Sequence, residues 1–293
     1  MSYDLDVLFE PAVQRSRVLD YFAARKHFKV RDNKVVYGNP NTGVYFYVKL
    51  QSSTNILLRR TVVSATFEIN YYRPSYFGIE AENELSAFMT AFKPRIHDPQ
   101  MHGMGEGPYS REGFLRGWNF GNVFAVHSIM SQNPDDDVPS MPAEQLRSVW
   151  EWNYQSSELE WRRPSSFVPE IMFFRIDGHL SRAAIWPTGG PILLPRVDYV
   201  LIGRVVSNEK RFGLAPWPEV LDVLQRAGLD TAKDPLDIAY LVIPQPIAEW
   251  VANIPLIDVD ALERLRPDEI LDDELIAAAR EFERDQVAAS DHD

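Results

Sequence analysis

Apolar and polar side chains alternate along the first residues of the chain. Tyr3, Leu5 and Val7 are apolar, and Asp4 and Asp6 stand between them. A period of two predicts a strand with one buried face. Similar runs, rich in β-branched and aromatic residues, predict further strands. These cover residues 34–37, 44–50, 61–72, 170–176, 180–186, 197–204 and 237–243.

Two turn sequences predict hairpins between neighbouring strands. The first is Asn39-Pro40-Asn41-Thr42-Gly43, and the second is Asp177-Gly178. An Asp-Gly pair between two apolar runs is a strong hairpin signal, because glycine accepts the positive φ that the turn requires.

Other segments carry apolar residues at helical spacing. Ala81, Leu85, Phe88 and Phe92 follow at i, i+4, i+7 and i+11 and predict an amphipathic helix. Ser110 is a candidate N-cap for the next helix, which is apolar nearly all round and is therefore expected to be buried. Helices are expected over residues 12–24, 76–92, 111–130, 143–154, 218–227, 247–253, 260–265 and 272–287.

Hairpin signals outnumber clear β-α-β alternation along the chain. This predicts an α+β fold with mostly antiparallel sheets and with helices packed on one side. A polar segment, residues 155–164, ends at a proline and indicates a boundary. We therefore expect two α+β subdomains, residues 1–160 and residues 161–293, the second of which ends in an acidic helix.

Composition narrows the class of protein. Hydrophobic residues make up 45% of the 293 positions, which is enough for a substantial core, and there is no cysteine. Disulfides, thiolate catalysis and cysteine-type zinc sites are therefore excluded. The N-terminal sequence lacks a secretory leader, and no apolar stretch reaches the roughly 20 residues that span a bilayer. We expect a cytoplasmic protein with no membrane partner.

Negative charge is concentrated at the C-terminal end. Residues 257–293 contain 13 acidic and 4 basic residues, a net charge of −9, whereas the whole chain has −12. Such a surface repels nucleic acid and favours association with a basic protein. The acids expected to contact that partner precede or begin the last helix: Asp268, Glu269, Asp272, Asp273 and Glu274.

The segment 97–109 and the helix after it hold the residues best suited to chemistry. A metal site needs three or four converging ligands, and the spacing of the two histidines here matches no helical metal motif. The interpretation that we favour is a structural loop whose side chains make local hydrogen bonds, with no metal and no cofactor. The alternative is a ligand site made of His97, Asp98, His102, Glu106, Asn119 and Asn122.

Known catalytic motifs are missing from the sequence. There is no G-x-S-x-G elbow and no H-E-x-x-H pattern, and the glycines at 103, 105 and 107 are in the wrong register for a phosphate-binding loop. No catalytic residue is assigned. Asn119 and Asn122 lie in the apolar helix that follows, where a buried amide must be hydrogen-bonded, and they are expected to tie a neighbouring loop to the core.

Three stretches carry a resemblance to a known group of proteins. They are YGNPNTGVYF at 37–46, FEINYYRPSYF at 67–77, and DPQ at 98–100 together with GWN at 117–119. Over about residues 3–130 the chain resembles bacterial proteins of toxin–immunity loci of the contact-dependent and type VI secretion kind. The resemblance implies an immunity-type protein that binds a cognate toxin, and it carries over no site residues.

Three functions follow from these observations. The first is a non-enzymatic binding protein, specifically a bacterial immunity protein that neutralises a toxin, such as a basic toxin domain, by direct binding. The alternative is an enzyme, a metal-dependent hydrolase or modifying enzyme, with its site in the 97–122 region. The third is a structural subunit of a larger assembly.

Overall fold

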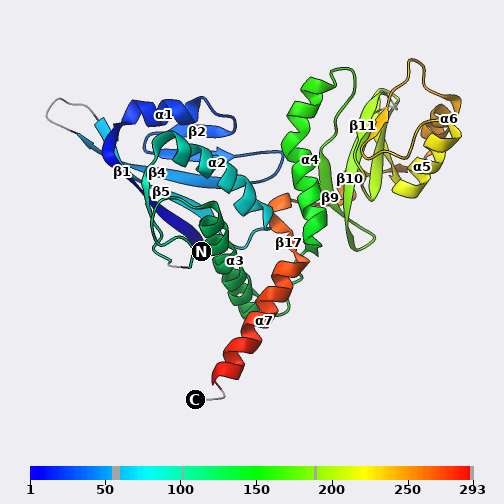
Figure 1. Cartoon of the computed structure of the whole chain (residues 1–293). Coiled ribbons are helices and arrows are strands. Elements are labelled where there is room, and N and C mark those ends of the chain that lie inside the picture. Colours follow the sequence, from blue (N-terminus) through cyan, green and yellow to red (C-terminus); the bar gives the residue numbers. More distant parts are fainter. Residues whose placement is uncertain (55–59, 101, 188–189, 291–293) are drawn as a thin grey trace. The chain divides into compact units, whose positions relative to one another are not determined.

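The computed structural model describes residues 1–54, 60–100, 102–187 and 190–290, and Figure 1 traces them. Its antiparallel sheets and helices confirm the predicted α+β fold class. The chain forms two compact units. The first contains residues 1–146 and the C-terminal segment that begins at Asp268, and the second contains Arg147–Pro267.

The sheet of the first unit is antiparallel, with the strand order β2-β3-β4-β5-β1-β6-β7. The alternating N-terminal residues form a central strand, and Tyr3, Leu5 and Val7 are fully buried on one face, as the pattern predicts. The strands are β1 (Ser2–Gln14), β2 (Phe28–Arg31), β3 (Lys34–Gly38), β4 (Tyr45–Thr54), β5 (Arg60–Asn70), β6 (Arg95–His97) and β7 (Glu106–Gly107).

Three helices of this unit follow its strands in the chain: α1 (Arg15–Ala23), α2 (Tyr76–Phe92) and α3 (Arg111–Gln132). The helix expected at 76–92 is confirmed, with Ala81, Leu85 and Phe88 buried. Ser110 caps α3 as predicted, because its side chain accepts a hydrogen bond from the backbone N–H of Gly113 at 3.1 Å. Helix α1 begins at Arg15 rather than near residue 12, since β1 continues through Pro11 to Gln14.

The C-terminal segment returns to the first unit. Strand β17 (Leu271–Asp272) pairs with β8 (Ser140–Met141) in parallel, and α7 (Asp273–Ser290) then packs along α3 (Figure 1). Their contact contains four buried apolar side chains, and Leu275 packs against this cluster. The four are Val126, Leu271, Ile276 and Ala279.

Two carboxylates, one buried and one exposed, fasten this returning segment. Asp272 is 2% exposed and accepts hydrogen bonds from the backbone N–H (2.7 Å) and the hydroxyl (2.8 Å) of Ser75, which precedes α2. Burial raises the pKa of Asp272 above its ordinary value, and the hydrogen bonds from Ser75 offset part of that rise. The Glu274 carboxylate accepts from the backbone N–H of Ala143 at 2.8 Å. The start of α7 is therefore joined to the beginnings of two other helices.

The second unit has a six-stranded sheet, β15-β13-β12-β10-β9-β16, in which β10 and β12 are parallel and the other pairs antiparallel. The Asp177-Gly178 hairpin is confirmed between β9 and β10, with positive φ at both residues. The strands are β9 (Ile171–Ile176), β10 (His179–Pro187), β12 (Tyr199–Val206), β13 (Glu209–Pro216), β15 (Leu256–Ile257) and β16 (Glu263–Leu265).

Helices α5 (Trp217–Arg226) and α6 (Gln245–Asn253) contact strand β12 of this sheet. A separate pair, β11 (Ile192–Leu194) and β14 (Leu236–Ile238), is shorter than the strand expected at 237–243. Because β11 offers only three residues to pair with, β14 ends at Ile238, and Leu241 and Val242 are exposed. The prediction of a helix at 260–265 is wrong as well, since Leu265 is buried in strand β16, which pairs with β9.

The units differ from the predicted subdomains 1–160 and 161–293 at two places. The boundary lies after Leu146, inside helix α4 (Ala143–Arg162), rather than after residue 160. The polar segment from residue 155 does not end the helix, because Asn153 and Ser156 supply buried positions at helical spacing. The acidic last helix belongs with the N-terminal part of the chain rather than with the second subdomain. None of the helices in the described ranges is long and apolar enough to cross a membrane.

Removing the Asp272 carboxylate tests its structural role. We expect Asp272→Ala to lower the free energy of unfolding by about 1–3 kcal/mol, because it leaves the Ser75 donors without their acceptor. Urea unfolding measures the change. Glu281→Gln, which changes an exposed carboxylate on the following helix α7, is the control and should stay within about 0.5 kcal/mol of wild type. An equal effect of both variants would contradict the assignment.

The raised pKa of Asp272 predicts a pH dependence of stability. An acid whose folded-state pKa is raised contributes its full stabilisation below the unfolded value, here 3.8, and loses it as the pH rises through the folded value. The difference in unfolding free energy between wild type and Asp272→Asn should therefore fall as the pH is raised from below 3.8. A difference that grows over this range would mean that the carboxylate is stabilised in its charged form.

Candidate functional site

Two residues of the predicted ligand site lie close together on adjacent strands and are exposed. His97 ends β6, Glu106 begins β7, and the two are opposite one another. Their side chains are 43% and 73% exposed, and His97 Nδ1 lies 3.4 Å from Glu106 Oε1. Solvent screens a pair this exposed, so it contributes little to binding or stability.

Asp98 is buried and organises the segment that follows it. Its carboxylate accepts hydrogen bonds from the hydroxyl of Tyr3 (2.7 Å) and from the backbone N–H groups of Gln100 and Met104 (3.1 Å each). Burial, together with the hydrogen bond to Asp98, raises the pKa of Tyr3 well above its ordinary value, which keeps the hydroxyl protonated as a donor. The favoured interpretation, local hydrogen bonding, accounts for this residue.

Asn122 ties a loop to the core, as the sequence predicts for a buried amide. Its side-chain oxygen accepts from the backbone N–H of Tyr72 at 2.7 Å, and its amide nitrogen donates to the carbonyl of Arg73 at 2.8 Å. The same expectation is wrong for Asn119, which is exposed because it lies farther from the centre of the buried face of α3 than Asn122 does. Throughout the described part of the chain, no group of three or more His, Asp or Glu side chains is placed to hold a metal ion.

His102, the remaining member of the predicted set, belongs to a different kind of site. Its ring stacks on Phe120 of α3 with the ring centroids 4.0 Å apart. Both residues line a pocket of about 470 Å³, which we call the aromatic pocket. Its lining residues come from the N-terminus, the position directly after β5, the 97–109 segment, α3 and α7: Met1, Ser2, Tyr71, Gln100, His102, Gly117, Phe120, Gly121, Phe124 and Phe282.

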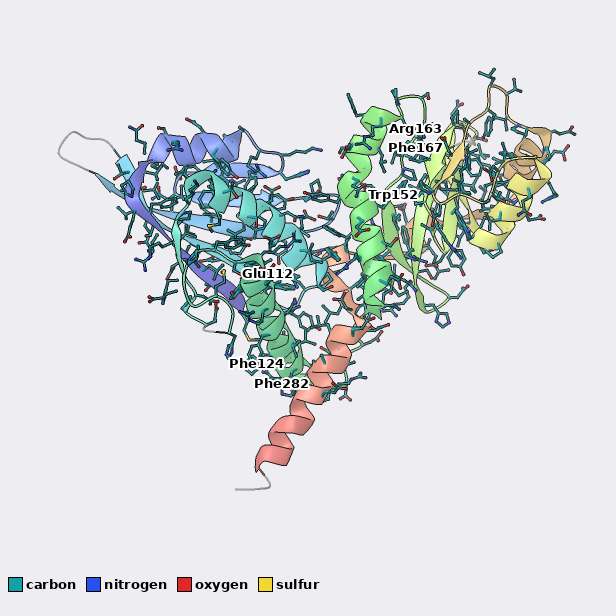
Figure 2. All side chains as sticks on the ribbon, in the orientation of Figure 1. Glu112, Phe124, Trp152, Arg163, Phe167 and Phe282 are labelled. Atoms are coloured by element: carbon teal, nitrogen blue, oxygen red, sulfur yellow. The ribbon has the colours of Figure 1, made fainter. Side chains whose placement is uncertain are left out.

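Aromatic side chains on two helices form one side of this pocket. Phe124 and Phe282 lie next to each other where α3 meets α7 (Figure 2), with ring centroids 6.0 Å apart, and Phe120 lies 6.3 Å from Phe282. Phe120 is 41% exposed and Phe124 is 45% exposed. The expectation that α3 is buried all round is therefore wrong, because α7 covers only part of its surface.

Two glycines on α3 allow the adjoining tyrosines to pack directly against the helix. A Cβ atom at Gly121 would lie 2.1 Å from the hydroxyl of Tyr71, and one at Gly117 would lie 2.4 Å from the hydroxyl of Tyr3. Gly117 and Gly121 repeat at i and i+4, and so do Phe120 and Phe124, so that the four lie on one face of α3 and line the same pocket. This doubled spacing is the sequence signal that could have indicated the pocket.

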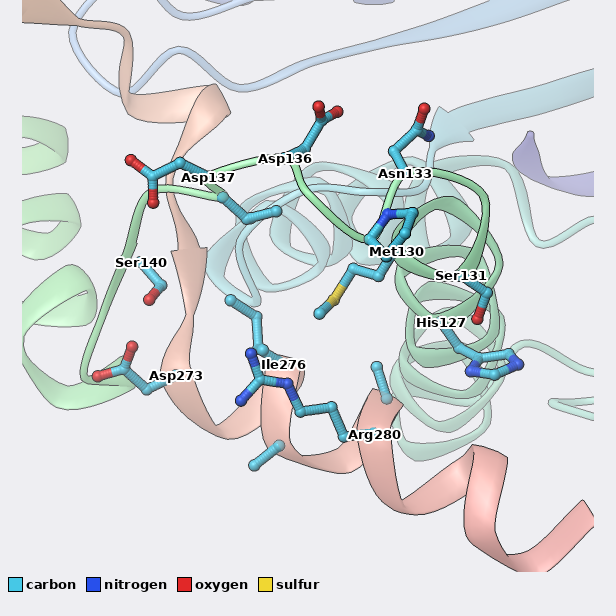
Figure 3. A pocket seen from close by; sticks show the side chains of 14 residues that line it. His127, Met130, Ser131, Asn133, Asp136, Asp137, Ser140, Asp273, Ile276 and Arg280 are labelled. Carbon is cyan, nitrogen blue, oxygen red and sulfur yellow. The ribbon is translucent and has the colours of Figure 1, made fainter. Parts of the chain in front are cut away.

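A second pocket, of about 610 Å³, lies where α7 begins, and Figure 3 shows its lining side chains. Asp136 and Asp137 lie on the loop after α3, and Asp273 and Arg280 extend from α7. The lining thus contains three carboxylates and one guanidinium, so we call this the acidic pocket. His127 also lines it.

The five acids predicted to contact a partner have different positions. Asp268 and Asp272 are 3% and 2% exposed, and Asp268 lies 4.0 Å from the Arg73 guanidinium, so these two serve the interior of the unit. Glu269, Asp273 and Glu274 are exposed. Of these, Asp273 lines the acidic pocket.

Comparisons of the chain with protein-family models, with curated proteins and with solved structures gave no match.

Paired substitutions in the 97–109 segment separate structural from functional roles. We expect Asp98→Ala to cost about 1–3 kcal/mol of unfolding free energy, because three donors lose their acceptor, one of them the buried Tyr3 hydroxyl. His97→Ala removes only an exposed pair and should change stability by less than about 0.5 kcal/mol. Thermal or urea unfolding of both variants measures this. A stable Asp98→Ala protein would reopen a ligand role for the carboxylate.

Proposed function

We propose that this chain is a non-enzymatic binding protein, and specifically an immunity-type bacterial protein that neutralises a cognate toxin by binding it directly. The observation that carries the proposal is the aromatic pocket. Phe120 and Phe124 together expose a large apolar surface next to Phe282, at the junction of two helices. Aromatic anchors at a pocket are typical of the energetic centre of a protein–protein interface.

Charge supports a basic partner. Residues 147–267 contain 13 basic and 16 acidic residues, a net of −3, which leaves −9 of the chain's −12 for the first unit. That unit carries the aromatic pocket and the acidic pocket. A negative field of this kind accelerates the association of a positively charged protein and disfavours acidic ones.

The toxin–immunity assignment rests on the resemblance over about residues 3–130. The three stretches that carry it lie in the first unit, the unit that bears both pockets. Immunity by direct binding requires a rigid surface that covers the active surface of a toxin. The docking of α7 on α3, fixed by Asp272 and Glu274, supplies a surface of this kind.

The roles of individual residues support binding over catalysis. The side chains of Asp98 and Asn122 make hydrogen bonds within the fold, and His97 lies next to Glu106 at the surface. The enzyme alternative at 97–122 needs these side chains to converge on a substrate. The aromatic pocket takes only His102 from the same set, together with its neighbour Gln100.

Affinity capture from the native host tests the proposal. The tagged full chain should recover one basic protein in a stoichiometric complex, and adding the chain should block that protein's toxicity. Phe124→Ser should weaken the complex at least about tenfold, as expected for the loss of a hot-spot aromatic side chain. The matched control is Phe167→Ser, since Phe167 is exposed to a similar extent, 43%, but lies in the second unit.

Two results would contradict this function. One is a captured partner whose toxicity is unchanged in the complex. The other is stoichiometric metal in the purified chain that is lost on changing His97 and His102 to alanine, which would favour the metal-dependent enzyme instead.

A further inference from the structure

We propose that the occupant of the aromatic pocket is a basic segment of the partner, which packs an apolar side chain against Phe120, Phe124 and Phe282 and places a lysine or arginine in the acidic pocket. This inference rests on the proposed function and specifies the chemistry of the partner. It treats the two pockets as one docking surface on the α3–α7 pair.

Two side chains connect the pockets. Phe282 lines the aromatic pocket, and His127 lines the acidic pocket. Their rings are in contact, with centroids 5.6 Å apart. Both pockets therefore border the same helix–helix junction, and a single segment crossing that junction can reach both.

The aromatic pocket suits an apolar side chain. It is lined mainly by aromatic rings and by the two glycines of α3, and its volume of about 470 Å³ falls within the range of roughly 300–1,000 Å³ for pockets that bind ligands. Burying a partner's side chain there would also cover Phe120 and Phe124, which solvent now reaches. Removal of apolar surface from water drives such an association.

Charge complementarity selects the rest of the segment. Asp136 and Asp273 are exposed carboxylates in the lining of the acidic pocket, which also contains Asp137 and Arg280. Glu281, next to Phe282, is exposed and adds another negative charge. The guanidinium of Arg116, on α3, donates a hydrogen bond to the carbonyl of Gly103 at 2.6 Å. An acidic segment would be repelled here, whereas a lysine or arginine gains an attractive partner.

Selection from a random-peptide display library against the immobilised full chain tests the inference. Enriched peptides should combine an aromatic or leucine side chain with lysine or arginine. Phe124→Ser should abolish the enrichment. A triple variant, Asp136→Asn, Asp137→Asn and Asp273→Asn, should keep the apolar preference and lose the basic one.

Asp135→Asn is the matched charge control, because Asp135 is an exposed neighbour in the same loop that does not line the pocket. It should leave the selected sequences unchanged. For one synthetic peptide from the selection, the triple variant should raise Kd at least about tenfold at low salt, and the difference should shrink as salt screens the charges. Circular dichroism and urea midpoints equal to wild type confirm that each variant is folded.

Several outcomes would overturn the inference. These are an absence of enrichment, enrichment of acidic or uncharged peptides, or a basic preference that survives the triple variant. A dimer in light scattering that Phe124→Ser dissociates would mean that a second copy of the chain fills the pocket. A captured toxin whose binding is weakened by Phe124→Ser but ignores the triple variant would sink this inference while leaving the proposed function intact.

Discussion

The docking of α7 against α3 is the interaction on which the rest of the account depends. Apolar packing around Val126, Ile276 and Ala279 holds the two helices together, and Asp272 fixes the start of the returning segment at Ser75. A buried carboxylate of this kind is costly unless hydrogen bonds satisfy it. Without this return, Phe282 would not reach Phe124, and neither pocket would exist in its present form.

Acidity has two separate uses in this chain. Some C-terminal carboxylates are internal, where Asp272 accepts hydrogen bonds and Asp268 faces Arg73. Others, including Asp273, remain at the surface beside the loop that carries Asp136 and Asp137. The net charge of a segment therefore overstates the charge available to a partner. Only the exposed fraction steers association and rejects like-charged proteins.

Local patterns predicted local structure well. The alternation at Tyr3–Val7, the Ser110 cap and the Asp177-Gly178 hairpin all appear as expected, because each depends on neighbouring residues alone. The return of the C-terminal segment could not be predicted, since it depends on contacts such as Asp272 with Ser75, far apart in sequence. For the same reason, the apolar residues of α3 predicted a buried helix. Phe124 is exposed because α7, which is distant in sequence, covers only part of α3.

The most direct test of the central claim is amide hydrogen exchange of the chain, alone and in complex with its captured partner. Exchange reports which backbone segments become protected when a surface is covered. The account predicts new protection on the solvent-facing part of α3, in the loop that carries Asp136 and Asp137, and along α7. Protection confined to the second unit, with α3 and α7 unchanged, would contradict it.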